Sequence, residues 1–450
     1  MIISGHPTGN PNSHHAALAW HERGKLYKFC TPWFPSQRQL SLLGHVPGLR
    51  DQARRLARRH FEPLAGAGMR QSRLAEISRM VRERLGWTGP EFTRSANNWL
   101  MTVMASECRD RHVSAVHSFE DCSLRQFQEA KRLGKACIYD MPTCHWKFWE
   151  SQHRNLCSLY ADWIRPQDAV FTLNASPEQK DEELRLADEV LAPSTFVKRT
   201  LEEAGAKAVS VCRYGVDAEF WCPAGSGDQE TAESARRVAK QPTDKRPRDE
   251  EQERLKDEKT KRQPEGGSRS PEAALLATSD SLRVAPALRF IYEGQCSLRK
   301  GIPFILEAWE KAGLRNAELM LVGGWQLAVE RLKSLPPGVR YIGPVGPERL
   351  RELYRQSDAF VFPSFGDGFG LVMLEALASG LHVMASDRSG GPDLAAESGV
   401  TVLPAGNEEA WIAALREFRS RREGKTGLSE EWRWERYRRD VFEATKNLIG

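Results

Sequence analysis

Residues 361–394, VFPSFGDGFGLVMLEALASGLHVMASDRSGGPDL, constrain the fold more than any other stretch of the chain. The segment starts with an apolar run and passes through a glycine-rich loop, Gly366–Gly370, into a helical pattern that Gly380 ends. A second apolar run follows at once. Strand, loop, helix and strand in this order predict one half of a parallel α/β sheet.

The loop combines two kinds of binding group. Its glycines let backbone N–H groups approach a ligand closely at a helix N-terminus, where the helix dipole favours anions. Asp367 in the loop and Glu375 in the helix, with seven residues between them, add carboxylates that can accept hydrogen bonds from hydroxyl groups. A sugar nucleotide carries both phosphate and hydroxyl groups and fits this combination.

Length and charge set the broad class of the protein. A chain of 450 residues is too long for one hydrophobic core, so two domains are expected. The 65 basic and 60 acidic side chains give a net charge of +5, which does not indicate a nucleic-acid partner. We see neither an apolar run long enough for a transmembrane helix nor the pattern of a signal peptide. The nine cysteines form no CxxC pair, so reduced, mostly buried thiols in a cytoplasmic protein are expected rather than a disulfide frame or zinc site.

The first half predicts a doubly wound domain. A short strand at residues 1–4 leads into a loop rich in Gly, Pro and Asn, and then into a helix capped by Ser13 that ends near residue 23. The strand LYKFCT follows. His14 and His15 open the helix, and a solvated first turn is favoured over a metal site because no further ligand spacing is visible.

Polar side chains follow two later strand patterns, HVSAVHSFE and ACIYD. Ligands collect at the carboxyl ends of parallel strands. The candidates for contact with a second substrate are therefore His117, Glu120, Asp140 and His145. For each of them a structural role is an equal alternative.

Residues 49–60, LRDQARRLARRH, predict a helix with arginines over much of its surface. A solvated basic face is the slightly favoured interpretation. The alternative is attachment to anionic lipid at the inner face of a membrane, because basic helices gain from the negative surface potential.

Composition changes between about residues 223 and 285, where charged residues, Pro, Gly and Ser dominate and aromatics are almost absent. Burial of so few apolar groups cannot offset the loss of conformational entropy on folding. A disordered insertion is therefore predicted. Strand and helix patterns then alternate from ALRFIYEGQ onward, including a predicted helix at QLAVERLKSL, and the chain ends in a long amphipathic helix.

Two cations follow the first strand of this second half. Arg299 and Lys300 lie in GQCSLRKG, where they could neutralise the charge on a diphosphate leaving group. Taken alone, this turn would be an exposed basic surface. The loop Gly366–Gly370 belongs to the same predicted sheet and follows a strand in the same way, so the two loops are expected to converge on one site.

Several motifs recur in order: LADEVLAPSTFVKRTLEEAG, VCRYGVD, GQCSLRKGIPFILEAW, LVGG, YIGPV and FPSFGDGFGLVMLEALASGLHVMASDRSGGPD. Together they resemble the retaining glycosyltransferases of family 4, which have the GT-B fold. The resemblance implies an α/β protein of two doubly wound, Rossmann-like domains that face each other across a cleft. The implied scheme is an acceptor-binding domain at 1–217, a disordered charged insertion at 218–286, a nucleotide-sugar-binding domain at 287–430 and a helix at 431–450 that crosses back to the first domain.

The resemblance also implies roles for individual residues. The implied catalytic residues are Asp367, Lys300, Arg299 and His145, and the implied donor-binding residues are Gly9, Gln295, Ile342, Gly368, Phe369, Gly370, Leu371 and Glu375. Asp367 would contact the hydroxyls of the transferred sugar and Glu375 the ribose of the nucleotide. The chain departs from the family twice, because Asp367 stands in place of a glutamate and Gln295 in place of an arginine that Arg299 would replace.

The implied reaction transfers a sugar from a nucleotide sugar to a glycan, lipid or small-molecule acceptor, with retention of configuration and with neither metal nor other cofactor. Two alternatives stay open. One is a GT-B epimerase or hydrolase acting on nucleotide sugars, and the other is a non-catalytic nucleotide-sugar-binding protein, which the departures at Asp367 and Gln295 motivate. The expected partners are the nucleotide sugar and the acceptor, without nucleic acid.

Overall fold

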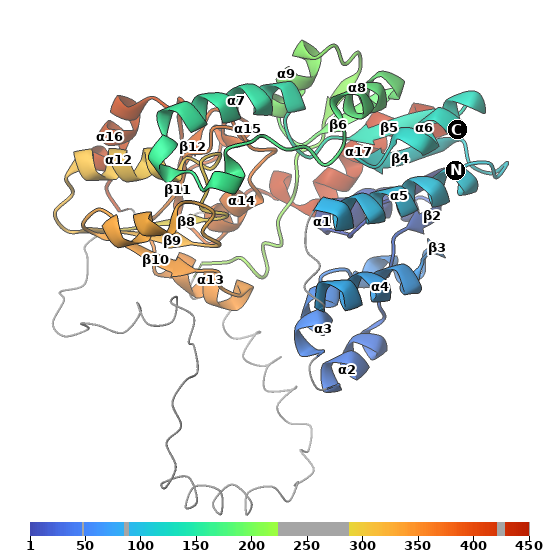
Figure 1. Ribbon diagram of the computed structural model, residues 1–450, viewed down its shortest axis with the longest axis horizontal. Helices are drawn as coiled ribbons and strands as arrows, with labels where there is room; N and C mark the ends of the chain where they lie inside the picture. Colours follow the sequence, from blue (N-terminus) through green and yellow to red (C-terminus); the bar gives the residue numbers. More distant parts are fainter. Residues whose placement is uncertain (47–48, 85–89, 224–287, 421–427, 450) are drawn as a thin grey trace, which may run out of the picture. The chain divides into compact units, whose positions relative to one another are not determined.

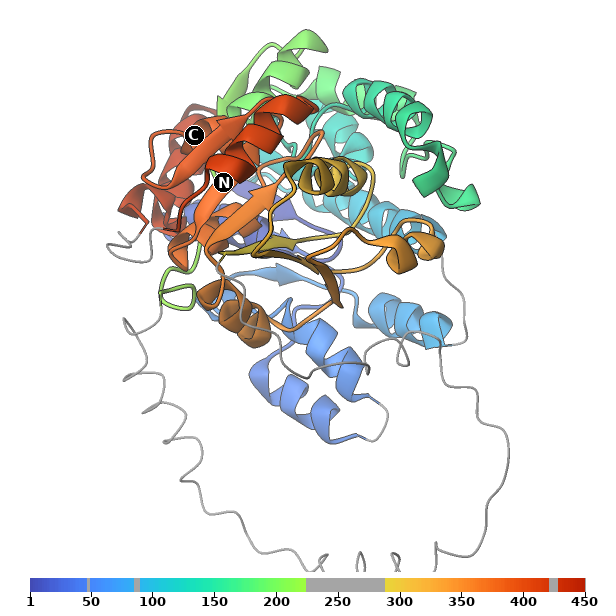
Figure 2. The same ribbon diagram turned by 90° about the vertical axis from the view of Figure 1, so that its left-hand side faces the viewer.

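The computed structural model describes residues 1–46, 49–84, 90–223, 288–420 and 428–449. The predicted insertion lies outside the described residues from residue 224 to residue 287, so its disorder stays a prediction. Two parallel sheets with helices on both faces organise the described chain, as Figures 1 and 2 show. The expected α/β class with two Rossmann-like domains is confirmed.

The first sheet has seven strands, all parallel, in the order β3-β2-β1-β4-β5-β6-β7. Their bounds are β1 (Ile2–Gly5), β2 (Leu26–Cys30), β3 (Met69–Arg70), β4 (Ala115–Phe119), β5 (Ala136–Asp140), β6 (Glu189–Ala192) and β7 (Val209–Val211). Ile2 belongs to one hydrophobic cluster and its neighbour Ile3 to the other. Because successive side chains point to opposite faces of a strand, both faces of this sheet are buried.

The helices of the first half are α1 (Pro11–His21), α2 (Gln37–His45), α3 (Arg50–Ala57), α4 (Arg73–Arg84), α5 (Pro90–Glu107), α6 (Leu124–Arg132), α7 (Trp146–Leu159), α8 (Pro177–Leu186) and α9 (Thr195–Glu203). Of these, α1, α5, α6, α8 and α9 contact strands of the first sheet. Helix α1 shares the cluster that contains Ile2, whereas α5 and α6 share the cluster that contains Ile3. Among the described residues, no helix is long and apolar enough to span a membrane.

The start of α1 differs from the prediction. Asn10, not Ser13, is the N-cap, and the two form a reciprocal capping box in which each side chain accepts from the other's backbone N–H at 2.9 and 3.0 Å. The solvated first turn predicted for His14 and His15 is also wrong. His14 is buried and stacks on Phe61, and His15 stacks on Trp434 with ring centres 4.2 Å apart. Burial lowers the pKa of His14 to about 4 and that of His15 to about 3.

The second sheet has six parallel strands in the order β10-β9-β8-β11-β12-β13. Its elements are β8 (Leu288–Glu293), α12 (Ile302–Ala312), β9 (Ala317–Val322), β10 (Val339–Gly343), α13 (Pro347–Arg355), β11 (Ala359–Phe362), α14 (Leu371–Ala378), β12 (His382–Ser386), α15 (Gly391–Leu394), β13 (Val400–Leu403) and α16 (Glu408–Glu417). This is the doubly wound strand order. From β8 the chain adds β9 and β10 on one side of the sheet and then β11, β12 and β13 on the other, so the strand order reverses between β8 and β11. Loops that follow the strands at such a point diverge and leave a crevice for ligands.

The helix predicted at QLAVERLKSL is wrong, because only a 3-10 helix forms there, at Val329–Ser334. Trp325 pairs with Cys296 in an isolated β-bridge, and the Gln326 N–H donates to the Cys296 carbonyl at 2.9 Å. These bonds hold the first part of the segment extended. Two prolines at residues 336 and 337 then prevent the helix from continuing.

The last helix, α17 (Trp434–Ile449), packs on α1 in the first half of the chain. Trp20 donates its indole N–H to Thr445 at 3.0 Å, and the Ser114 hydroxyl donates to the Ile449 carbonyl at 2.7 Å. Its first residue, Trp434, stacks on His15, whereas His14 is packed by Phe61 of the first half. Sequence reasoning could not place these contacts between distant segments, and so it misjudged the burial of the two histidines.

Candidate functional site

Two loops of the second sheet meet at the reversal point. Residues 294–301 follow β8, and residues 363–370 follow β11. At Gly301, whose φ is +74°, an added Cβ would lie 2.1 Å from the Pro363 carbonyl oxygen, so no other residue type fits. Helices α12 and α14 start directly after these loops, each with a glycine N-cap and no side-chain cap. The positive ends of two helix dipoles therefore lie beside the meeting point of the loops.

Lys300 and Asp367 form an ion pair that joins the two loops. Only 13% and 14% of their side-chain surfaces are exposed. Burial by itself would raise the pKa of Asp367, but the charges of Lys300 and Arg299, with hydrogen bonds from Lys300 and the Gly368 N–H, outweigh it and lower that pKa. Asp367 is therefore an ionised acceptor at neutral pH.

Arg299 lies beside this pair on the side of the first half of the chain. Its guanidinium carbon is 4.9 Å from the ring centre of Trp149 in α7, close enough for a cation–π contact. Its carbonyl oxygen accepts from the Phe365 N–H at 2.9 Å, which fixes the turn against the second loop. The side chain is exposed, so its charge is accessible to a ligand.

A pair of carboxyl groups lies behind the loops. Burial, and then the charge of Glu293, raise the pKa of Glu375 to about 8. Burial also raises the pKa of Glu293, while the charge of Lys300 opposes that rise. Glu375 therefore holds a proton near neutral pH and can both donate to and accept from a hydroxyl group. Sequence reasoning missed Glu293, although a charged residue at the carboxyl end of an apolar strand was a signal for it.

The glycine-rich loop contacts the first half of the chain directly. An added Cβ on Gly368 would lie 1.8 Å from the Pro142 carbonyl oxygen. The Ser194 hydroxyl donates to the Gly368 carbonyl at 2.6 Å while it also caps α9. Nearby, the covered Asp393 carboxylate accepts from both the N–H and the hydroxyl of Thr195, at 3.0 and 2.9 Å. The residues after β5 and β6 thus form one wall of the site.

The remaining predicted donor residues of the second half lie around these loops. Phe369 is buried, and its ring packs against Trp432, so its backbone rather than its side chain is offered to a ligand. Gln295 is exposed and lies beside Gly324, where an added Cβ would be 2.7 Å from its Oε1 atom. Ile342 is half-buried near the end of β10. Gly370 and Leu371 begin α14.

Gly9 and His145 make other contacts. The Gly9 N–H donates to Nδ1 of His6 at 2.9 Å. His145 caps α7 and its N–H donates to Thr200 at 3.2 Å, while its Nε2 faces Asp181 at 3.4 Å. Burial lowers the pKa of His145 to about 4. These surroundings favour a structural role for His145, and its catalytic assignment stays a prediction.

The other acceptor-side candidates separate into two groups. His117 and Asp140 are fully enclosed in the first sheet, with 3.6 Å between Nε2 and the carboxylate. Glu120 instead lines a cavity of about 380 Å³ together with Thr143, Trp149, Lys180, Leu298 and Arg299. Its carboxylate accepts from Lys180 at 2.6 Å, and burial raises its pKa to about 7. This cavity joins the acceptor-side candidate Glu120 to the cation Arg299.

Within the described part of the chain, no group of three or more His, Cys, Asp or Glu side chains is placed to hold a metal ion. All nine cysteines are free thiols, and seven of them are buried. The groups that the two loops and their surroundings offer a ligand are cations, carboxyls, helix N-termini and glycine amides. The cations are Lys300 and Arg299, and the carboxyls are those of Asp367, Glu375 and Glu293.

Known proteins resemble this second half in sequence. The family described as "Glycosyl transferases group 1" matches residues 287–420. This part of the chain is similar to glycosyltransferase group 1 domains. The O-antigen chain mannosyltransferase B of Escherichia coli is 33% identical over 124 residues, which are 25% of this chain and 32% of that protein. The D-inositol 3-phosphate glycosyltransferase of Nocardia farcinica is 34% identical over 152 residues, which are 33% of this chain and 29% of that protein. The chain thus spans about a third of the length of these curated relatives.

Solved structures resemble the whole chain in fold. Sucrose-phosphate synthase from Thermosynechococcus elongatus superposes with a TM-score of 0.51 at 14% identity, over 100% of this chain and 94% of that one. HepE of Anabaena, in complex with UDP, superposes with a TM-score of 0.52 at 13% identity, over 99% of both chains. These likenesses show the GT-B fold, in which the two Rossmann-like domains face one another.

Proposed function

We propose that the chain is a retaining glycosyltransferase that transfers a sugar from a nucleotide-sugar donor to an acceptor bound by the first half. The observation that carries the proposal is the Lys300–Asp367 pair, which joins two loops at the reversal point of a group 1 glycosyltransferase sheet. The relative named as a mannosyltransferase and the structure of HepE with UDP support a nucleotide-sugar donor.

Each group at the site has a task in this reaction. Lys300, Arg299 and the N-terminus of α14 would stabilise the charge that develops on the leaving diphosphate. Ionised Asp367 would accept hydrogen bonds from the hydroxyls of the transferred sugar, and Glu375 would bind the ribose. The bond between the sugar's anomeric carbon and the phosphate oxygen breaks, the acceptor oxygen bonds to the same face of that carbon, and the leaving phosphate takes the acceptor's proton.

The test measures UDP or GDP release from a panel of nucleotide sugars, with and without cell extract as the source of acceptor. Release that depends on extract supports transfer, and the NMR coupling of the product's anomeric proton reports whether configuration is retained. Release without extract supports the epimerase or hydrolase alternative. Tight donor binding without any release supports a binding protein.

Variants connect this activity to the site. Lys300→Ala should weaken donor turnover about 10²–10³-fold, the usual effect of removing a group that stabilises developing charge. Lys333→Ala is the matched control, because Lys333 is an exposed lysine of the same half on the 3-10 helix Val329–Ser334. Equal turnover by both variants would place the diphosphate elsewhere.

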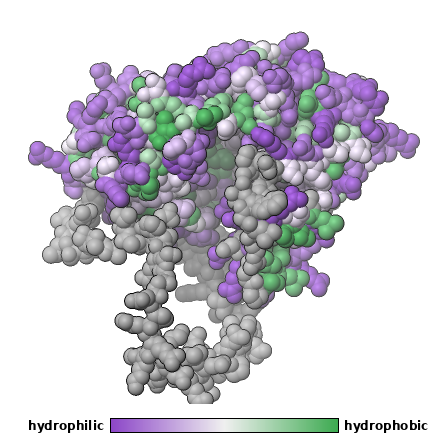
Figure 3. All heavy atoms as spheres, in the orientation of Figure 1, coloured by the Kyte–Doolittle hydropathy of each residue, from purple (hydrophilic) through white to green (hydrophobic). Residues whose placement is uncertain are grey.

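We also propose that helices α2 to α4 bind an anionic lipid surface. Arg54, Arg55 and Arg58 are exposed on and just after α3, whereas Ala53 and Leu56 face the interior. Exposed apolar side chains lie on or next to the adjoining helices: Leu42 (62%) on α2, Val46 (44%) directly after it, and Leu74 (81%), Ile77 (44%) and Val81 (53%) on α4. Figure 3 shows hydrophobic residues gathered in this region. Apolar contact from α2 and α4 would add to the attraction between α3 and anionic headgroups.

Sedimentation with vesicles tests this surface. The protein should bind phosphatidylcholine vesicles that contain phosphatidylglycerol, and high salt should weaken the binding. Leu74→Asn should weaken it about tenfold, because a largely exposed leucine would otherwise be buried in lipid. Val329→Asn, at a side chain 59% exposed on the other half, is the control. If both variants bind like the original protein, α4 does not touch lipid.

A further inference from the structure

The cavity beside Arg299 continues into a second and larger cavity. The first, of about 380 Å³, is the inner lobe, and the second, of about 610 Å³, is the outer lobe. They share five lining residues: Asp121, Trp146, Phe171, Leu173 and Asn174. Each lobe falls in the range of about 300–1,000 Å³ that is typical of small-molecule sites. The two therefore form one groove that leads away from the reacting groups.

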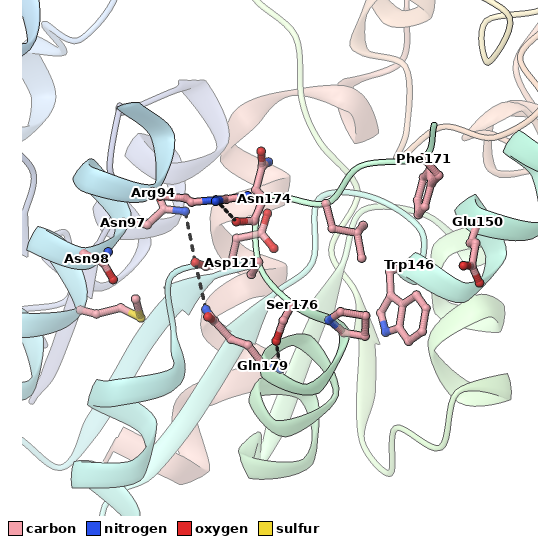
Figure 4. A pocket seen from close by; sticks show the side chains of 14 residues that line it. Arg94, Asn97, Asn98, Asp121, Trp146, Glu150, Phe171, Asn174, Ser176 and Gln179 are labelled. Carbon is pink, nitrogen blue, oxygen red and sulfur yellow. Dashed lines mark hydrogen bonds between the residues drawn. The ribbon is translucent and has the colours of Figure 1, made fainter. Parts of the chain in front are cut away.

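The walls of the outer lobe differ in chemistry. Helix α5 contributes Arg94, Asn97 and Asn98 to one wall, and Trp146 and Phe171 lie across the lobe from them, as Figure 4 shows. Asn97 is 5% exposed, and its Oδ1 atom has no hydrogen-bond partner among the described residues. A buried acceptor without a partner indicates a missing donor.

Asp121 lies where the two lobes join, and its backbone is strained. Its φ is +70°, and within the described chain it is the only non-glycine residue with a positive φ. Its N–H donates to Glu183 at 3.0 Å, and its carbonyl accepts from Asn97 at 3.1 Å and Gln179 at 3.3 Å. Its carboxylate pairs with Lys180. Such strain persists mostly at functional sites, where the surroundings fix the conformation.

From this groove we infer that the acceptor is an oligosaccharide, and that the outer lobe binds the sugar units behind the one that accepts the transferred sugar. Aromatic rings offer flat apolar surfaces to the C–H faces of sugar rings. Amides and carboxylates opposite them supply the paired donors and acceptors that hydroxyl groups need. The combined volume of the two lobes gives room for more than one ring. This inference rests on the proposed transfer reaction, because the inner lobe must place one hydroxyl near Arg299 and Asp367.

Binding of acceptors of graded length tests the inference. Isothermal titration uses the full chain with gluco- and manno-oligosaccharides of one to four units, in the presence of UDP. In at least one series, the affinity should rise about tenfold or more between one and three units. Asn98→Ala removes a polar group of the outer lobe only, so it should lower the affinity for the trisaccharide about tenfold and leave the monosaccharide unchanged.

Controls separate the outcomes. Thr93→Ala alters an exposed residue of the same helix that lines neither lobe, and it should bind every probe like the original protein. Equal affinity for all lengths, or no oligosaccharide binding by a protein that still binds UDP, overturns the inference. So does a loss of binding to phosphatidylglycerol vesicles in Asn98→Ala without any effect on oligosaccharides, which would assign the lobe to a lipid headgroup. Failure to bind UDP or any nucleotide sugar would instead contradict the proposed function.

Discussion

The two halves of the chain share a doubly wound fold, but the segments that follow their strands are packed differently. In the second half, the loops after β8 and β11 touch each other, and the Lys300–Asp367 pair joins them. In the first half, the segments after β4 and β5 border a groove of two cavities. In the proposed reaction, the closely packed loops would bind the phosphate and ribose of the donor, and the groove would bind the acceptor.

The largest expected effect comes from forcing apart the close contact between the two halves at Gly368. Gly368→Ala should lower transfer about 100-fold or more, because its Cβ would lie 1.8 Å from the Pro142 carbonyl oxygen and would push the halves apart. Steady-state kinetics with donor and acceptor measure this loss. Gly346→Ala is the control, since its Cβ would meet its nearest neighbour at 3.5 Å. Similar rates for both variants would show that the close contact at Gly368 is unnecessary.

The Asp393 carboxylate ties the two halves together, and its removal should cost stability. It accepts from Thr195 and, at 2.9 Å, from Arg213, with no exposed surface of its own. Asp393→Ala should therefore lower the free energy of unfolding in urea by about 2–3 kcal/mol. Asp387→Ala removes a carboxylate that is bonded only within the second half, to Ala405, and should cost less. Equal losses would mean that Asp393 adds nothing by joining the halves.

The pH dependence of stability should distinguish the buried carboxyl pair of the donor side. In the folded chain Glu375 keeps its proton up to about pH 8, whereas the ordinary pKa is 4.5. The protein therefore loses stability as the pH rises from about 4.5 to 8, and Glu375→Gln lacks this loss. The variant should be about 4 kcal/mol more stable than the original at pH 8 and equal to it at pH 4, each measured by thermal unfolding. Glu310→Gln, at an exposed glutamate of α12, is the matched control. A constant difference for Glu375→Gln would mean that this carboxyl titrates normally.

The smallest effect is expected at His145. If this side chain only caps α7, His145→Ala should cost about 1 kcal/mol of stability and leave the kinetic constants nearly unchanged. His145→Asn should restore the stability, since asparagine is also a good N-cap. A large loss of kcat in both variants, with unfolding unaffected, would instead assign His145 to catalysis.

The meeting of the loops after β8 and β11 could be predicted because the information for it is local. Glycines and charges within a few residues of a strand end mark these loops, and strand patterns also predicted the sheets. The groove of two cavities could not be predicted, because it joins segments that are distant in the chain. Arg94 hydrogen-bonds the carbonyl of Asn174, 80 residues away, and the strained Asp121 looks like any loop aspartate. Glu293 was missed for a different reason. Its effect at the site is to raise the pKa of Glu375, and the sequence did not show that the two carboxyls lie close together.

The position of α17 has a consequence for how the protein is made. Residues 432–434 lie against the backbone around Gly215, where an added Cβ would meet the Trp434 nitrogen at 2.3 Å. The final segment also covers α1, near the beginning of the chain. On the ribosome, the first half must therefore wait for roughly 200 more residues, or about 10–40 s of synthesis, before its surface is complete. A ribosome stalled short of residue 434 would hold an N-terminal domain with its apolar α1 face uncovered, available to a chaperone.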